Sequence, residues 1–245
     1  MTFLPNSLTS ADKHLEQEVC VYTRAEVDLL LMKNVLKQLV RRVIRRALEI
    51  PKRGLPSLRT NRDSFDQEWG IETSKIVWLT NLGSANYVHG VRYEGCDPAA
   101  CMWAIQSACI SPSDFYFIDV GCGKGRPLII ASRFPFERLI GVEYSAKLCR
   151  HAEDNLRHCG VAPVRFEILC KDAAEFEFPD RNLFVWFYNP FNSVVLEHVL
   201  ANLQRVARRR KVLIAFQGKG RHRLDACGWL MKLGSRSNVS LFQSS

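Results

Sequence analysis

One feature constrains this chain more than any other, namely a short apolar run followed at once by three closely spaced glycines. Residues 115–120 are almost wholly apolar and predict a buried strand, and the string Gly121-Cys-Gly123-Lys-Gly125 follows directly. Pro127 and the apolar residues 128–131 then open a helix, since proline is well tolerated in a first helical turn. Glycines allow a tight turn and let the backbone approach a ligand at a helix N-terminus. This order predicts a ligand-binding turn.

The next elements complete a β-α-β unit. A strand is predicted at 138–142, ending at Glu143, and a helix follows from about Ser145 to His158. An acidic residue that closes the second strand of such a unit is placed to accept hydrogen bonds from ribose hydroxyls. The unit therefore predicts a nucleoside-binding site.

The loop also indicates which nucleoside is bound. A dinucleotide fingerprint requires a third glycine where Arg126 stands. The string Asp119-x-Gly121-x-Gly123-x-Gly125 instead resembles the first motif of class I S-adenosylmethionine-dependent methyltransferases. The resemblance covers roughly residues 90–217. It includes Glu143, Asp172-Ala173 after a strand at 164–169, and a strand at 183–188.

The resemblance implies a doubly wound α/β sheet of the Rossmann-like methyltransferase type, with S-adenosylmethionine as cofactor. It also implies roles for individual residues. Glu143 would hold the ribose, and Asp172 with Ala173 the adenine. The backbone of Gly121, Gly123 and Gly125 would face the methionine portion, with Asp119 fixing the loop.

The string Asn189-Pro190-Phe191 follows the strand at 183–188 and is the candidate catalytic segment. It resembles the N-P-P-Y/F string of methyltransferases that act on planar nitrogens, with one proline fewer. That resemblance implies that Asn189 and a backbone carbonyl accept the amine hydrogens, while Phe191 stacks on the acceptor. A strand-to-helix turn explains Asn-Pro equally well, because both residues favour turns.

Two upstream segments carry further candidates for cofactor binding. Residues 87–95 include Tyr93 and resemble the cofactor-covering segment of the non-SET histone-lysine methyltransferases and related bacterial proteins. The string Phe65-Asp66-x-x-x-Gly70-x-x-Thr73 resembles a segment of uncharacterised bacterial methyltransferases. Tyr93 and Thr73 are therefore predicted to contact the cofactor, with ordinary loop packing as the alternative. His89 is either a proton acceptor or a hydrogen-bonded structural residue.

The net charge of the chain is +9, and the excess of basic residues is concentrated in two stretches. Residues 33–63 hold 10 basic and 2 acidic side chains, and residues 205–245 hold 10 and 1. A helix is predicted at 24–50, with one apolar face and a basic remainder. It either packs on the main domain or meets anionic lipid or nucleic acid, with coiled-coil pairing as a third alternative. The basic cluster at 205–211 ends a predicted helix, whose dipole it complements, or contacts a polyanion.

The remaining composition bounds the protein class. No apolar run reaches the roughly 18 residues of a membrane span, and the first residues lack the order of a secretory signal. A cytoplasmic protein is expected, with peripheral membrane association as an alternative. The nine cysteines form no C-x-x-C pair, so reduced, mostly buried thiols and no metal site are expected. Cys122, inside the glycine loop, is interpreted as a packing residue rather than a nucleophile.

These observations predict three parts: a basic helical extension at 1–63, a cofactor-covering segment at 64–89 and a methyltransferase domain at 90–245. The predicted activity is methyl transfer from S-adenosylmethionine to a nitrogen, first of all on a protein lysine. Nucleic-acid and small-molecule acceptors are the alternatives within the enzyme class. A non-catalytic cofactor-binding protein or a membrane-surface adaptor is the alternative outside it. The sequence indicates neither the acceptor nor the oligomeric state.

Overall fold

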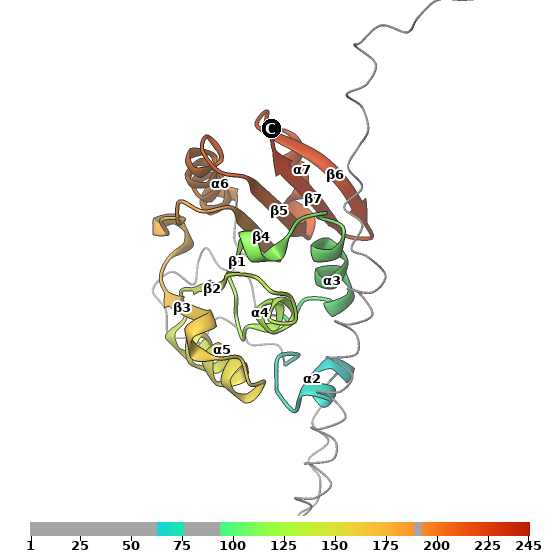
Figure 1. Ribbon diagram of the computed structural model, residues 1–245, viewed down its shortest axis with the longest axis vertical. Coiled ribbons are helices and arrows are strands. Elements are labelled where there is room, and N and C mark those ends of the chain that lie inside the picture. Colours follow the sequence, from blue (N-terminus) through green and yellow to red (C-terminus); the bar gives the residue numbers. More distant parts are fainter. Residues whose placement is uncertain (1–62, 76–93, 189–192) are drawn as a thin grey trace, which may run out of the picture. The chain divides into compact units, whose positions relative to one another are not determined.

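The fold is built on one seven-stranded sheet. The computed structural model describes residues 63–75, 94–188 and 193–245, and Arg59–Ser245 form one compact unit (Figure 1). The strand order is β3-β2-β1-β4-β5-β7-β6. The strands are β1 (Tyr116–Val120), β2 (Arg138–Glu143), β3 (Phe166–Cys170), β4 (Leu183–Tyr188), β5 (Val212–Gln217), β6 (Leu230–Arg236) and β7 (Val239–Ser244). The order reverses on either side of β1, which confirms the doubly wound sheet predicted from the sequence.

Strands β1 to β5 are parallel, and β7 joins them antiparallel to β5. The sequence also predicts the last strands at 212–216 and 238–243, paired antiparallel. β5 and β7 confirm this, with Ala215 opposite Leu241 in the register. β6 was not predicted. It lies at the sheet edge, and most of its residues are exposed, so it lacks the apolar alternation that marks a half-buried strand.

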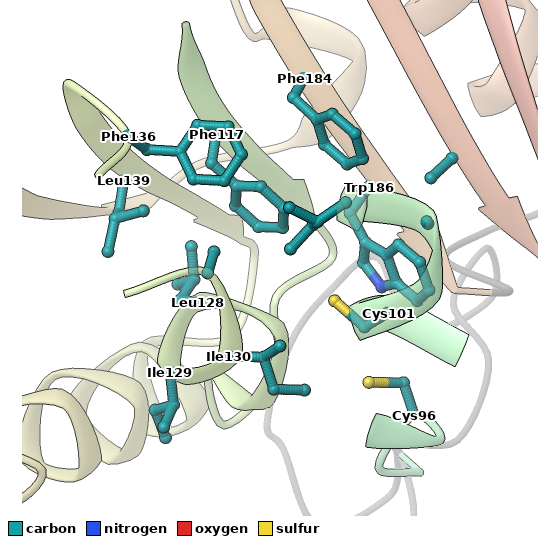
Figure 2. Close-up of a cluster of buried hydrophobic side chains, with 14 of the residues drawn as sticks. Cys96, Cys101, Phe117, Leu128, Ile129, Ile130, Phe136, Leu139, Phe184 and Trp186 are labelled. Carbon is teal, nitrogen blue, oxygen red and sulfur yellow. The ribbon is translucent and has the colours of Figure 1, made fainter. Parts of the chain in front are cut away.

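Two apolar layers cover the sheet because side chains alternate between its faces. Phe117 of β1 and Trp186 of β4 point to one face, where they meet α3 (Pro98–Gln106), α4 (Arg126–Ala131) and α5 (Ala146–His158). Figure 2 shows this layer, with the α4 side chains Leu128 and Ile130 below the aromatic rings. The other face packs on α6 (Ser193–Ala207) and α7 (His222–Asp225). Both layers are fully buried at the centre, so the sheet is a rigid support for the loops at its ends.

Local signals fix the helix starts. Asp97 caps α3 by accepting a hydrogen bond from the Ala99 amide, and Pro98 follows in the first turn. Ser145 caps α5 by accepting from the Leu148 amide. The short helix α2 (Ser64–Trp69) is capped at its start by Asp63 and at its end by Gly70, which is left-handed at φ 69°.

Several predictions lie outside the described residues. They concern the basic helix at 24–50 and the surface at 33–63, together with Tyr93, His89 and the segment Asn189-Pro190-Phe191. Among the helices that are described, none combines the length and the apolar character that a membrane span requires.

Candidate functional site

The predicted site lies at one edge of the sheet, where the parallel strands end. β1 and β2 are in register from Tyr116 opposite Arg138 to Val120 opposite Val142, so the glycine loop starts beside Glu143. Glu143 in turn lies opposite Cys170, two residues before Asp172. The predicted acids are thus brought to the carboxyl edge, where open α/β sheets bind ligands.

The glycine loop needs its glycines. Gly121, Gly123 and Gly125 have φ angles of 80°, 53° and 81°, a region that side chains of L-residues rarely adopt. Backbone bonds hold the loop, since the Gly121 and Cys122 amides both donate to the Val142 carbonyl at 2.8 and 3.0 Å. The Gly125 amide donates to the Cys122 carbonyl at 2.8 Å. The loop is therefore a fixed turn at the start of α4.

Glu143 ties this loop to α5. Its Oε2 accepts a hydrogen bond from the Gly123 amide and its Oε1 accepts one from the Ser145 amide, each at 3.0 Å. The side chain is buried, and burial raises the pKa of Glu143 although the amides of Ser145, Gly123 and Tyr144 oppose that shift. Each carboxylate oxygen keeps a further lone pair, which a hydroxyl group can use.

Asp119 is the least satisfied acid of the site. It is 2% exposed, and its Oδ2 is buried without a hydrogen-bond partner. Burial first, and the charge of Glu143 second, raise the pKa of Asp119 well above its ordinary value. Its register partner on β4 is Trp186, whose indole N–H is likewise buried and unpartnered. Buried polar groups are normally paired, so these two atoms either bind a ligand or lower the stability of the folded protein.

Asp172 and Ala173 come two and three residues after Cys170, the last residue of β3. Asp172 caps the short 3-10 helix Ala173–Glu175 by accepting a hydrogen bond from the Ala174 amide at 2.9 Å. Ala173 is buried in the layer under α6. The cap fixes where the carboxylate lies, and the predicted adenine contact stays a prediction.

Thr73 lies beside the loop through a contact that the sequence did not predict. Its hydroxyl donates to Asp66 and accepts a hydrogen bond from Arg126 Nε at 2.6 Å. Arg126, read in the sequence only as the residue replacing a third glycine, is 3% exposed. Lys124, inside the loop, is also buried and pairs with Glu72. The signal in the sequence was the pair of cations, Lys124 inside the loop and Arg126 directly after it, since such residues are rarely buried unless they are paired.

At the same edge of the sheet, the structure describes the chain up to the end of β4, beside the predicted catalytic segment. Tyr188, its last residue, lies opposite Gln217 of β5. Gln217 is buried, donates to Asn238 Oδ1 at 3.1 Å, and leaves its Oε1 unpartnered. The candidate catalytic residues 189–191 follow Tyr188, so their roles stay predictions.

Cys122 faces the core. Burial first, and then the charges of Asp119 and Glu143, raise the pKa of its thiol well above the ordinary value. A Cβ placed on Gly141 would lie 2.8 Å from Cys122 Sγ, so the sulfur fills the space beside β2. A protonated, enclosed thiol is a poor nucleophile, which agrees with the packing role. The eight described cysteines are all free, and the described ranges hold no group of three or more potential metal ligands.

Comparison with known proteins finds a family match over part of the chain. Residues 117–210 match the family model described as a methyltransferase domain. No curated protein matches the chain in sequence.

Several solved structures are similar to part of this chain. A ribosomal protein L11 methylase from Lactobacillus delbrueckii subsp. bulgaricus is 15% identical, with 60% of this chain and 76% of that chain covered and a TM-score of 0.45. An RNA methyltransferase from Salinibacter ruber, solved with S-adenosyl-L-homocysteine, is 19% identical, with 61% and 91% covered and a TM-score of 0.44. A dimethyladenosine transferase from Plasmodium falciparum is 12% identical, with 60% and 61% covered and a TM-score of 0.47. At these identities none of them indicates an acceptor for this chain.

Proposed function

We propose that the protein is a class I methyltransferase that transfers a methyl group from S-adenosylmethionine to a nitrogen atom of its acceptor, because residues 117–210 match the model of a methyltransferase domain. The observation that carries the proposal is the meeting of three acids and one glycine loop at the carboxyl edge. Asp119, Glu143 and Asp172 come from the ends of β1, β2 and β3. Each acid is fixed in place by a buried position or by a backbone hydrogen bond.

The described residues fit the cofactor. Asp119 Oδ2 is a buried acceptor without a partner, and a cationic ligand group would satisfy it. Glu143 keeps lone pairs for ribose hydroxyls, and the three left-handed glycines present backbone without a side chain to a ligand. Gly121, Gly123, Gly125, Glu143, Asp172 and Ala173 would hold the cofactor together with Asp119.

S-adenosylmethionine supplies a methyl group that is already activated by the sulfonium charge. The protein therefore has to orient the cofactor and align the acceptor nitrogen rather than supply strong acid or base. An acceptor amine must arrive deprotonated, and removal from water favours its neutral form. The end of β4, followed by Asn189-Pro190-Phe191, is where the acceptor would be aligned.

A protein lysine is the first candidate acceptor, by the resemblance of residues 87–95 to the cofactor-covering segment of lysine methyltransferases. A nucleic-acid nitrogen is the second, and a charge asymmetry favours it. Residues 218–223, which follow β5, and Arg236 at the end of β6 supply four Lys or Arg and no acid. One of these four, Arg223, pairs with Glu197 of α6 at 3.0 Å. The β6–β7 turn lies beside the end of β5, since the Gly218 amide donates to the Asn238 carbonyl at 3.0 Å. The edge beyond β5 thus carries an excess of basic residues, which would favour an anionic acceptor.

The basic cluster at 205–211 lies elsewhere. It ends α6 and precedes β5, so it sits at the amino edge of the sheet, opposite the cofactor site. Within it, Arg210 Nε pairs with Asp180 Oδ1 at 3.0 Å. A polyanion bound there would not be presented to the end of β4, so this cluster adds no support for a nucleic-acid acceptor.

Transfer of labelled methyl into a host lysate tests the function. The full chain is incubated with labelled S-adenosylmethionine and lysate, and the products are divided into protease-treated, nuclease-treated and low-mass fractions. We expect label above that obtained with the Asp119→Ala variant. Loss of label on protease treatment supports a protein acceptor. Loss on nuclease treatment supports the second candidate, and binding should then weaken steeply with salt. Absence of label in every fraction contradicts the proposed transfer.

A further inference from the structure

The segment Asp63–Lys75, here called the strap, is folded around one buried carboxylate. Asp66 is fully buried and accepts hydrogen bonds from the amides of Thr73 and Ser74, each at 2.7 Å, and from the Thr73 hydroxyl. Burial alone would raise the pKa of Asp66, yet these hydrogen bonds outweigh it and lower the pKa. The strap therefore holds an ionised group inside the protein, which requires a cation.

That cation is Arg126, the first residue of α4. Its Nη2 lies 2.7 Å from Asp63 Oδ2 and 3.2 Å from Asp66 Oδ1, and its Nε donates to Thr73. Its Nη1 donates to the Cys96 carbonyl at 3.0 Å. All three nitrogens of the guanidinium are used, an arrangement that the compact ammonium of a lysine cannot reproduce.

The strap also pairs with a second cation, Lys124, which lies inside the glycine loop. Lys124 Nζ lies 2.7 Å from Glu72 Oε1 and 3.3 Å from the Lys75 carbonyl. Lys124 and Arg126 flank Gly125, so the strap contacts the chain on both sides of the last left-handed glycine of the loop. The fit is close, because a Cβ on Gly95 would come within 2.7 Å of the Thr73 carbonyl and 3.0 Å of the Arg126 guanidinium carbon.

We infer that the strap is part of the cofactor-binding apparatus and that Arg126 is a positioning residue, which holds the glycine loop in its binding conformation. The inference rests on the proposed function, since it assigns the loop to the cofactor. A loop with three left-handed residues loses conformational freedom when it is ordered. Strap docking orders it before the ligand arrives, so less of that cost falls on binding.

Linkage then requires a reciprocal effect. If docking of the strap strengthens cofactor binding, the cofactor must strengthen docking of the strap by the same factor. S-adenosyl-L-homocysteine, added to the full chain, should therefore slow hydrogen exchange of the amides at 71–74 as well as those of the loop. Slower exchange confined to the loop and to the end of β2 would overturn the inference.

Three variants of the full chain separate positioning from stability. Arg126→Met removes the cation at the start of α4. Gly95→Ala displaces the strap sterically while every charged group stays. The matched control is Arg165→Met, because Arg165 Nη2 holds the turn that follows α4 through the Phe134 and Phe136 carbonyls, each at 3.1 Å. Affinity for S-adenosyl-L-homocysteine is measured by calorimetry, and the unfolding free energy by urea denaturation.

We expect Arg126→Met to weaken binding by about 10- to 100-fold. Gly95→Ala should weaken it in the same direction, and Arg126→Lys should recover part of the loss. Arg165→Met should lower the unfolding free energy and leave the affinity unchanged. Wild-type affinity in both Arg126→Met and Gly95→Ala, or equal losses in all three variants, would overturn the inference. A wild-type chain that binds no ligand contradicts the proposed function itself.

Discussion

Replacing Gly123 with valine should abolish cofactor binding while the protein stays folded. Gly123 has a φ of 53°, where a residue with a side chain is strained by about 1–2 kcal/mol and a β-branched one by more. The valine side chain would also add bulk to the loop that is proposed to face the methionine portion of the cofactor. We expect the affinity for S-adenosylmethionine to fall by more than about 100-fold, a free-energy loss of about 2.7 kcal/mol.

The matched control is Gly228→Val, because a Cβ at Gly228 would meet no atom within 4 Å. Circular dichroism and urea unfolding establish that both variants are folded, and calorimetry measures the affinity. Binding of wild-type strength by Gly123→Val would show that the glycine loop is not the cofactor site.

Replacing Asp119 with alanine should remove cofactor binding without destabilising the protein at neutral pH. The Asp119 carboxyl is buried, and its raised pKa means that its charged form is disfavoured in the folded chain. A carboxyl whose pKa is higher in the folded than in the unfolded state costs stability as the pH rises. That cost begins near the unfolded pKa of about 4 and is complete above the folded pKa.

The alanine variant lacks this cost, so its stability relative to the wild type should increase as the pH rises through that window. Urea unfolding at a series of pH values measures the difference. Asp180→Ala serves as the control, because Asp180 is half-exposed at the opposite edge and its pKa is lowered by Arg210. Unchanged cofactor affinity in Asp119→Ala would contradict the role assigned to this acid.

The elements that could be predicted from the sequence are those whose residues carry their own signal. β1, β2, β4 and β5 are buried on both faces, so each appears as a continuous apolar run. The position of Glu143 follows from β2, which it ends, and that of Asp172 follows from β3, which ends two residues before it. The edge strand β6 gave no such signal, since exposure removes the need for apolar residues.

The contacts of the strap could not be predicted from the sequence. Arg126 pairs with Asp63 and Asp66, about 60 positions earlier in the chain, and nothing in local periodicity links them. The resemblance of the segment around Thr73 predicted a cofactor contact. The structure places the Thr73 hydroxyl between Asp66 and Arg126, and the predicted cofactor contact stays a prediction. Long-range ion pairs of this kind depend on tertiary packing, which a single sequence does not reveal.

The most direct test of the central claim is a calorimetric titration of the folded full chain with S-adenosyl-L-homocysteine. This ligand reports occupation of the cofactor site and requires no acceptor. We predict saturable binding at one site per chain, together with a rise in the thermal midpoint that grows with ligand concentration. A folded chain that gives neither a heat of binding nor a change in its thermal midpoint would contradict the assignment of the carboxyl edge as a cofactor site.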